Sequence, residues 1–411
     1  MAGDIELRID SLGNGVGGVS RPEGSRTVFV RGALPGELVR CSVEKEAKSY
    51  VRASLLEVLE PSPYRMAPSC SYFGRCGGCS LQHFHYSRQL YWKREWILRA
   101  MARADVEVHR EAVLQTVPSP REMGYRNRVS FDMTPEGPGL HMHRGDPIPV
   151  EGCPLMDPVG SRVFRQLAGR SMQGCRRISV RSSAVTGESM VEFSGMPDRG
   201  FPPLGMEVAC SCRENGDWVP SAPETMMHEM LGDLKYRISP GAFFQVNSGS
   251  AGLLAQRVAA FADRGHEVLD IYGGCGTFAL QAAGRGAVVT SVEMSLISSE
   301  DGRTSARENG ITGVSFVTSR ARHFLLDTVR SGRRWDAVIV DPPRSGLGTR
   351  VARLLRRIDS PLVLYVSCNP FSLARDLATI CEKGWRVAGI EPVDMFPQTD
   401  HIEMITELRR M

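Results

Sequence analysis

The chain of 411 residues lacks any long hydrophobic run, and no apolar stretch approaches the roughly 20 residues that cross a bilayer as a helix. Its first ten residues include the charged side chains Asp4, Glu6, Arg8 and Asp10, and they lack the apolar segment of a signal peptide. Hydrophobic residues make up 42% and charged residues 23%, which excludes a disordered or fibrous chain. We therefore expect a cytoplasmic protein of two or three domains.

The chain also lacks a large net charge, because 50 Lys and Arg stand against 46 Asp and Glu, for a formal charge of +4. The charges are unevenly distributed, however. Residues 61–130 contain eleven basic and five acidic residues, whereas residues 1–60 contain eight and nine. A basic central segment fits a polyanionic partner, although a solvated basic surface has the same composition. A helix is predicted at 87–104, and most of its basic side chains are expected on a solvated face. These side chains are Arg88, Lys93, Arg94, Arg99 and Arg103.

Three segments with different patterns divide the chain. Residues 1–60 contain short strands separated by glycines, at Ile5–Ile9, Thr27–Val30, Glu37–Val43 and Ser54–Leu59, which is typical of a small β-barrel. Residues 61–235 form a predicted central α+β domain, in which 125–230 alternate polar and apolar residues as in an antiparallel sheet. From 236 to 411 strands and helices alternate, which predicts a Rossmann-like α/β domain with a parallel sheet. Its predicted strands are Val268–Tyr272, Val288–Glu293, Val314–Val317, Ala337–Val340 and Leu362–Val366. Helices are predicted between them, for example Phe278–Ala283, Ser298–Glu308 and Phe371–Lys383.

Two glycine-rich loops have different interpretations. Gly13, Gly15 and Gly18 match G-x-G-x-x-G, but no helix follows them, so we interpret them as a hairpin loop. The loop at 269–277 follows a strand and opens a helix, and Glu293 ends the next strand 20 positions after Gly273, where a carboxylate can accept hydrogen bonds from ribose hydroxyls. This loop lacks the third glycine of a dinucleotide site, so S-adenosylmethionine fits it better than NAD.

Candidate catalytic groups follow the later strands. Cys368 comes directly after the strand 362–366, at the carboxyl edge where open α/β sheets bind ligands, and the next helix begins just beyond it. A helix N-terminus favours a thiolate, although a buried structural cysteine is an open alternative. The segment 341–344, Asp-Pro-Pro-Arg, ends the preceding strand at the same edge. Glu403 precedes a further apolar strand and is a candidate base, and His401 is the alternative base.

Three cysteines, Cys70, Cys76 and Cys79, lie within ten residues, and Cys153 is the best candidate for a fourth ligand. Four thiolates suit zinc or an iron–sulfur cluster. The segment lacks the two C-x2-C pairs of a zinc ribbon and the C-x3-C-x2-C spacing of radical enzymes. The spacing therefore favours an iron–sulfur cluster, with zinc as the alternative.

Six motifs, taken in order, resemble the RNA uracil-5-methyltransferases, and specifically their iron–sulfur-containing 23S rRNA branch. They are the four cysteines, Phe243–Asn247, the loop at 269–277, the segment 341–344, the segment 367–370 and His401–Glu403. Residues 5–60 resemble the TRAM domain of that branch, a small β-barrel that binds RNA. Two features depart from the pattern: Gly273 stands where members often have cysteine, which we expect the loop to tolerate, and residues 155–225 match weakly.

The resemblance implies a role for each of ten side chains. Contacts to S-adenosylmethionine are expected from Gln245, Tyr272, Glu293 and Asp341, nucleophilic attack from Cys368, proton abstraction from Glu403, and ligation of a [4Fe-4S] cluster from Cys70, Cys76, Cys79 and Cys153.

The expected reaction is methylation of uracil C5 in RNA, with 23S rRNA favoured over tRNA, by a monomer that binds no membrane. Cysteine adds to C6, the methyl group is transferred to C5, and proton abstraction and elimination follow. The same chemistry on tRNA, a small-molecule or DNA cytosine methyltransferase, and a non-catalytic RNA-binding iron–sulfur protein are the alternatives.

Overall fold

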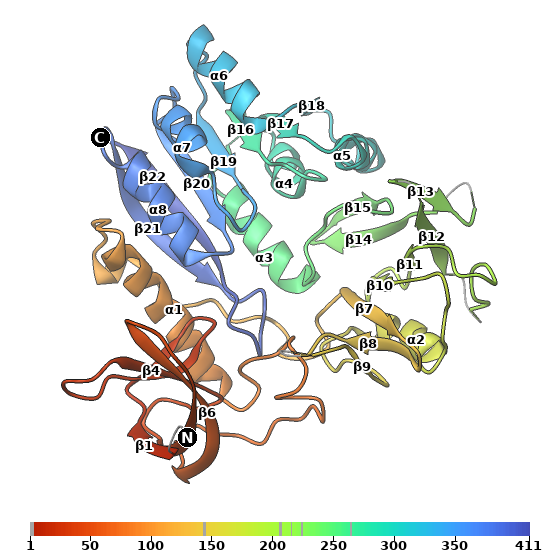
Figure 1. The fold of residues 1–411 in the computed structure, drawn as a ribbon. Coiled ribbons are helices and arrows are strands. Elements are labelled where there is room, and N and C mark those ends of the chain that lie inside the picture. Colours follow the sequence, from red (N-terminus) through yellow and green to blue (C-terminus); the bar gives the residue numbers. More distant parts are fainter. Residues whose placement is uncertain (1–3, 143–144, 205–207, 215, 223–224, 264) are drawn as a thin grey trace.

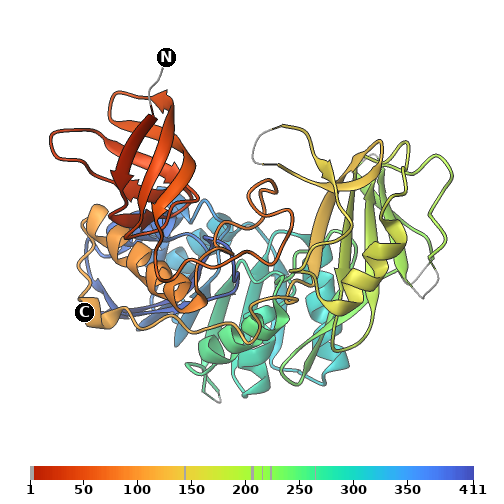
Figure 2. The same ribbon diagram turned by 90° about the horizontal axis from the view of Figure 1, so that it is seen from below.

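The computed structural model describes residues 4–142, 145–204, 208–214, 216–222, 225–263 and 265–411. It consists of an N-terminal six-stranded sheet, a central seven-stranded sheet and a C-terminal seven-stranded sheet with helices on its faces (Figure 1). Seen from below, the N-terminal and central sheets stand on opposite sides, and the loop that precedes the first helix runs between them (Figure 2). Within the described residues, every helix is too short or too polar to cross a membrane.

The N-terminal sheet curls into a compact β-structure around its own apolar core (Figure 2). Its strand order is β1-β5-β6-β4-β3-β2, with β4 and β6 parallel and the other neighbours antiparallel. The four predicted strands are present, and the glycines of the G-x-G-x-x-G match form the β2–β3 hairpin as expected. Gly17 has φ +86°, and a Cβ there would lie 2.7 Å from the Val30 carbonyl oxygen, so this turn requires glycine. The strands are β1 (Asp4–Arg8), β2 (Ser11–Gly13), β3 (Gly17–Ser20), β4 (Thr27–Arg31), β5 (Leu38–Glu46) and β6 (Tyr50–Glu60).

Helix α1 (Tyr86–Arg103) lies between the barrel and the C-terminal sheet (Figure 1). The Trp96 indole N–H donates to the Leu12 carbonyl at 2.9 Å, and apolar residues of the barrel, of the preceding loop and of α1 form one cluster there. Ile97 and Met101, further along the helix, enter the core of the C-terminal domain. Lys93 is an exception to the solvated basic face that was expected for most of the helix's charges, because its side chain is fully buried.

The central sheet has the strand order β13-β12-β11-β10-β7-β8-β9. Its neighbours are antiparallel as predicted, except that β11 and β12 are parallel. Helix α2 (Pro158–Leu167), which we did not predict, packs on β10 and β11, and the Asp157 carboxylate caps it by accepting from the Gly160 N–H at 2.7 Å. The strands are β7 (Arg128–Thr134), β8 (Gly137–Leu140), β9 (Ile148–Pro149), β10 (Arg177–Ser182), β11 (Ser189–Ser194), β12 (Ala209–Glu214) and β13 (Asp217–Pro220); a 3-10 turn, η1 (Arg110–Ala112), precedes them.

The C-terminal sheet confirms the predicted Rossmann-like alternation. Its strand order is β18-β17-β16-β19-β20-β22-β21. The five strands from β18 to β20 are parallel, and β22 is antiparallel to both of its neighbours, β20 and β21. The order reverses between β16 and β19, and open α/β sheets bind ligands at such a reversal. The strands are β16 (Glu267–Ile271), β17 (Val288–Glu293), β18 (Val314–Thr318), β19 (Ala337–Val340), β20 (Leu362–Ser367), β21 (Trp385–Val393) and β22 (Glu403–Arg410).

Helices pack on the faces of this sheet, and a hairpin of β14 (Met227–Leu231) and β15 (Leu234–Ile238) precedes it (Figure 1). The three helices given as examples are present with ends shifted by a few residues, and α6 and α7 also lie between strands, as the predicted alternation requires. Helix α3, which precedes the sheet and contains two glycines, was not predicted. The helices are α3 (Ser248–Ala259), α4 (Thr277–Gly284), α5 (Leu296–Glu308), α6 (Ala321–Ser331), α7 (Gly348–Arg356) and α8 (Pro370–Ile380).

Candidate active site

The glycine loop after β16 turns sharply into α4. Tyr272 has φ +66°, unusual for a residue with a side chain, and Gly276 at the start of α4 has φ +83°. A Cβ on Gly273 would collide with the Ser291 hydroxyl and lie 2.7 Å from an Asp270 carboxylate oxygen. This chain therefore needs glycine at position 273, because Ser291 fills the space beside the loop.

Glu293 is held beside the same loop at the end of β17. One carboxylate oxygen accepts from the Gly274 N–H at 3.1 Å, and the other accepts from the Ser295 N–H at 2.6 Å. Its carboxylate and the loop backbone thus face each other, as a site for a ribose requires.

Segment 243–247 reaches the glycine loop through its backbone. The Cys275 thiol donates to the Phe243 carbonyl at 3.3 Å, and the Asn127 amide donates to the Gln245 carbonyl at 2.9 Å. The Gln245 side chain is buried. A contact from Gln245 to a cofactor remains a prediction.

Two carboxylates lie at the strand reversal, on β16 and just after β19. Burial raises the pKa of Asp270 to about 7, although the Ser291 hydroxyl donates to it at 3.1 Å and opposes this rise. Burial also raises the pKa of Asp341, and the charge of Asp270 adds to the effect. Asp270 belongs to the loop at 269–277, in which no role was predicted for it. The shifted pKa values of this pair mark it as a candidate functional feature.

Cys368 lies between β20 and α8, in a turn that is tied to the Asp-Pro-Pro-Arg loop. The Asn369 side chain caps α8 by accepting from the Phe371 N–H at 3.0 Å, and its amide donates to the Arg344 carbonyl at 3.1 Å. Burial raises the pKa of Cys368 to about 12, the charges of Glu403 and Asp341 add to this, and the Arg344 guanidinium opposes it. The helix N-terminus therefore does not give a low pKa here, because burial and two carboxylates outweigh it.

Glu403 is the first residue of β22 and is buried. The antiparallel register pairs Ser367 with Met404, so its continuation places Glu403 beside Cys368. Burial and the Asp341 charge raise the pKa of Glu403, and Arg344 lowers it. The charges of Asp341, Glu403 and Arg344 thus all act on the Cys368 thiol at this edge of the sheet.

His401, the alternative base, lies against Arg344. Its Nδ1 and the Arg344 guanidinium are 3.1 Å apart, and its ring packs edge-on against Phe396. The charge of Glu403 raises the pKa of the Cys368 thiol. Among the described residues, His401 has no comparable effect on that pKa. The geometry therefore favours Glu403 over His401 as the partner of the cysteine.

The four cysteines of the predicted cluster, Cys70, Cys76, Cys79 and Cys153, line one cavity of about 690 Å³. Burial raises the pKa of three of these thiols, Cys79 to about 12, and the guanidinium of Arg126 in the same cavity opposes the rise. Among the described residues, no three His, Cys, Asp or Glu side chains converge closely enough to hold a metal ion. The thiols therefore surround a space instead of meeting at a point.

The segment that carries His401 and Glu403 is fastened by residues to which the sequence analysis gave no role. The Lys93 ammonium donates to the Asp394 carboxylate at 2.6 Å and to the Phe396 carbonyl at 3.0 Å. The Gln398 carbonyl accepts from the backbone N–H groups of Ser80 and Leu81 at 3.1 and 3.0 Å. The sequence contained one signal that Lys93 is buried. Lys93 stands four residues before the buried Ile97, so the two side chains lie on the same face of α1.

Comparisons with known proteins agree with this geometry. The tRNA (uracil-5-)-methyltransferase family model matches residues 227–411, and the TRAM domain model matches residues 5–56. An RNA methyltransferase from Geobacter sulfurreducens is 32% identical over 98% of this chain and 89% of its own length, and one from Thermosynechococcus vestitus is 32% identical over 98% and 97%. The crystal structure of Pyrococcus abyssi tRNA (uracil-54, C5)-methyltransferase with S-adenosyl-L-homocysteine has a TM-score of 0.79 and 28% identity, over 98% of this chain and 99% of that one.

Proposed function

The chain belongs to the RNA uracil-5-methyltransferase family, and we propose that it acts as a monomer on a uridine of 23S rRNA, with Cys368 as nucleophile and Glu403 as base. The observation that carries the assignment of roles is the placement of Cys368 beside Glu403, at the edge of the sheet that also bears the glycine loop. A non-catalytic RNA-binding protein would not need this pair.

The mechanism follows from the weak nucleophilicity of uracil C5. Addition of the Cys368 thiolate to C6 pushes electron density onto C5, and the nearby Arg344 guanidinium stabilises the negative charge. S-adenosylmethionine supplies the methyl group when bound. Glu403 then takes the C5 proton, and elimination breaks the bond between sulfur and C6 and restores the thiolate. A raised pKa makes the Glu403 carboxylate a stronger base than an exposed one.

We assign the cofactor site to Gln245, Tyr272, Glu293 and Asp341, around the strand reversal. The fit rests on the glycine loop, which leaves room for a ligand at Gly274, where a Cβ would meet nothing within 4 Å. The Glu293 carboxylate opposite Gly274 is suited to ribose hydroxyls.

We assign a [4Fe-4S] cluster to Cys70, Cys76, Cys79 and Cys153. Zinc would require the four sulfurs to lie about 2.3 Å from one point, whereas a four-iron cluster takes one thiolate on each iron and needs a wider space between them. Thiols that line one cavity suit the second arrangement. Iron would hold these cysteines as thiolates, and Arg126 would balance part of their charge.

The second candidate substrate is tRNA, and one observation favours it. The Pyrococcus abyssi tRNA enzyme covers 98% of this chain, so a barrel that precedes the catalytic domain does not by itself select rRNA. The preference for 23S rRNA rests on the resemblance of the cysteine spacing and the barrel to that branch.

The test is to incubate the protein with methyl-labelled S-adenosylmethionine and separated rRNA and tRNA, then to digest each RNA to nucleosides. We expect labelled 5-methyluridine in 23S rRNA, and sequencing of the RNA locates it. Label in tRNA alone would move the assignment to tRNA, and absence of label from both would contradict the proposed function.

The chemistry is tested separately with RNA that contains 5-fluorouridine, because fluorine cannot leave C5 as a proton does. The wild-type protein should form a stable covalent adduct that migrates slowly on denaturing gels. Cys368→Ala should form none, while its affinity for S-adenosylmethionine stays within about twofold of wild type. An adduct in the Cys368→Ala variant would show that another residue is the nucleophile.

A further inference from the structure

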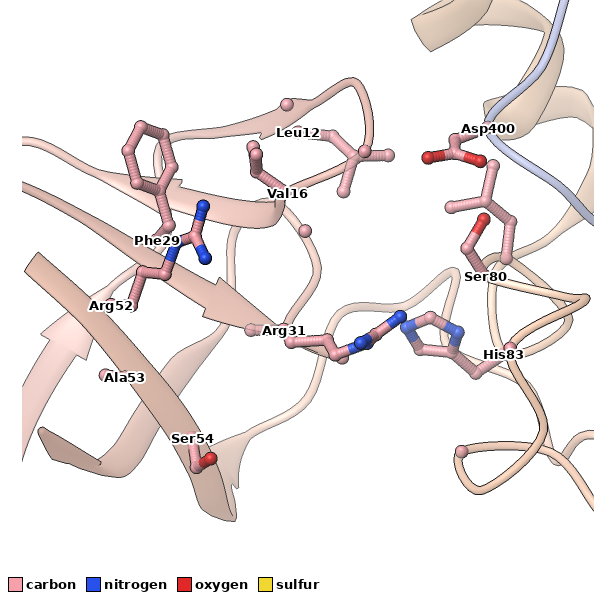
Figure 3. A pocket seen from close by; sticks show the side chains of 18 of the residues that line it. Leu12, Val16, Phe29, Arg31, Arg52, Ala53, Ser54, Ser80, His83 and Asp400 are labelled. Carbon is pink, nitrogen blue, oxygen red and sulfur yellow. The ribbon is translucent and has the colours of Figure 1, made fainter. Parts of the chain in front are cut away.

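A second cavity, of about 630 Å³, lies between the barrel, the cysteine-rich loop and the segment that leads to Glu403 (Figure 3). Its barrel wall comes from β4, β6 and the β2–β3 hairpin. Its other wall comes from residues 74–83 and from Asp400 and His401. A cavity of this size is large enough for a nucleotide.

Two polar side chains of this cavity, His83 and Ser80, lack a hydrogen-bond partner within the residues that the structure describes. The His83 side chain is 4% exposed, and within the part of the chain that the structure describes its ring nitrogens make no hydrogen bond of good geometry. The buried Ser80 hydroxyl likewise makes no hydrogen bond to the described residues. Both side chains lie on the wall of the cavity opposite the barrel (Figure 3). A buried polar group without a partner is costly, so a ligand with donors and acceptors would satisfy this wall.

The barrel wall offers an aromatic ring and positive charge. Phe29 and Arg52 lie together on it, and Arg31 points across the cavity towards His83 (Figure 3). The rings of Phe29 and Tyr50 are 5.8 Å apart, and the Arg52 guanidinium is 5.6 Å from the centre of the Tyr50 ring. Aromatic rings beside arginines form the type of platform on which unpaired bases stack, with phosphates close to the positive charge.

The cavity adjoins the catalytic centre through one side chain. His401 lines the cavity and also contacts the Arg344 guanidinium at 3.1 Å, and Arg344 acts on Cys368 and Glu403. An RNA strand that presents a uridine to Cys368 therefore has the cavity next to it.

We propose that this cavity holds an unpaired RNA nucleotide close to the target uridine in the chain, with its base against Phe29 and its polar edge towards Ser80 and His83. Arg52 and Arg75 on the cavity walls face its phosphate. The inference rests on the proposed function and adds to it a defined recognition site for a nucleotide that is not itself methylated. Single-stranded RNA is the expected ligand because a paired base could not stack on Phe29.

The first test is photo-crosslinking with RNA that carries 4-thiouridine at random positions, followed by digestion and mass spectrometry of the crosslinked peptides. We expect crosslinks in residues 27–31, 50–54 or 74–83. Crosslinks confined to the rest of the protein would overturn the proposal. This readout does not depend on methylation, so crosslinks in the cavity without any methylated uridine would contradict the proposed function and leave the nucleotide site standing.

The second test compares Phe29→Ala and Arg52→Ala with the control Arg40→Ala. Arg40 is an exposed arginine of the same barrel, outside the cavity wall, and is paired with Glu6 and Glu57. Each cavity variant should weaken binding of a single-stranded RNA substrate by about tenfold. Arg52→Ala should also reduce the slope of log affinity against log salt concentration by the amount that corresponds to about one phosphate contact. The control should change neither, and S-adenosylmethionine binding should be unaffected in all three. Equal RNA affinities for cavity and control variants would overturn the proposal.

Discussion

The Lys93 ammonium lies 2.6 Å from the Asp394 carboxylate, and both side chains are fully buried. The pair joins α1 to the start of the segment that ends in Glu403. Asp394 also accepts from the Phe396 N–H at 3.0 Å, which shapes the turn that follows. The ion pair thus connects the helix that packs against the barrel with the position of the proposed base.

Lys93→Met should therefore destabilise the protein by about 3–5 kcal/mol, because it leaves the Asp394 carboxylate buried without its cation. The double variant Lys93→Met/Asp394→Asn should recover much of this loss, since Asn keeps an acceptor for the Phe396 N–H. Denaturant unfolding measures both. Arg103→Met, at the exposed end of α1, is the control and should change stability by less than about 0.5 kcal/mol. A Lys93→Met protein as stable as this control would contradict the role of the ion pair.

Glu403→Gln should block the proton-abstraction step and leave the earlier steps intact. Methylated RNA should then accumulate as a covalent adduct with Cys368, visible on denaturing gels with ordinary uridine RNA. His401→Ala should turn over without accumulating an adduct, because His401 contacts Arg344 and the carboxylate that acts on Cys368 is that of Glu403. The opposite result, an adduct with His401→Ala and none with Glu403→Gln, would make His401 the base.

The pH dependence of kcat/KM should have a rising limb above neutral pH. The Cys368 thiol and the Glu403 carboxyl must both lose a proton to act, and the pKa of each is raised, so their active forms are populated only at higher pH. Arg344→Ala should move the limb to still higher pH, because the guanidinium lowers both pKa values. Arg350→Ala, an exposed arginine on α7, is the matched control. A profile that Arg344→Ala leaves unchanged would argue against this electrostatic role.

Anaerobically purified protein should contain about four irons per chain. Cys76→Ser or Cys153→Ser should lower the iron content, whereas Cys381→Ser on the opposite domain should not. Gly77 and Gly78 of the cysteine loop line both the thiol cavity and the proposed nucleotide cavity. Loss of iron should therefore weaken RNA binding and leave S-adenosylmethionine binding intact. Stoichiometric zinc without iron would overturn the cluster assignment.

The parts of the fold that were predictable are those in which local pattern and long-range packing agree. The buried strand at 362–366 is a continuous apolar run, and the strand at 268–272 is apolar except for Asp270; a strand buried on both faces in a parallel sheet requires such apolar side chains. Helix α3 was not predicted, because it precedes the first strand of the sheet and its two glycines lower its helix propensity. Helix α2 was missed because its ten residues lie within 125–230, which was predicted as an antiparallel sheet region.

By itself the sequence determined which chemical groups follow which strands, because the order of strand, glycine loop and cysteine is written along the chain. Only the tertiary structure decided which of these groups interact. Lys93 looked like a surface charge, and its burial against Asp394 depends on a residue 301 positions away. The raised pKa of Cys368 likewise depends on Glu403 and Asp341, which reach it from two other strands. Burial and electrostatic interactions depend on distance in space, and sequence spacing determines that distance only within one helix or strand.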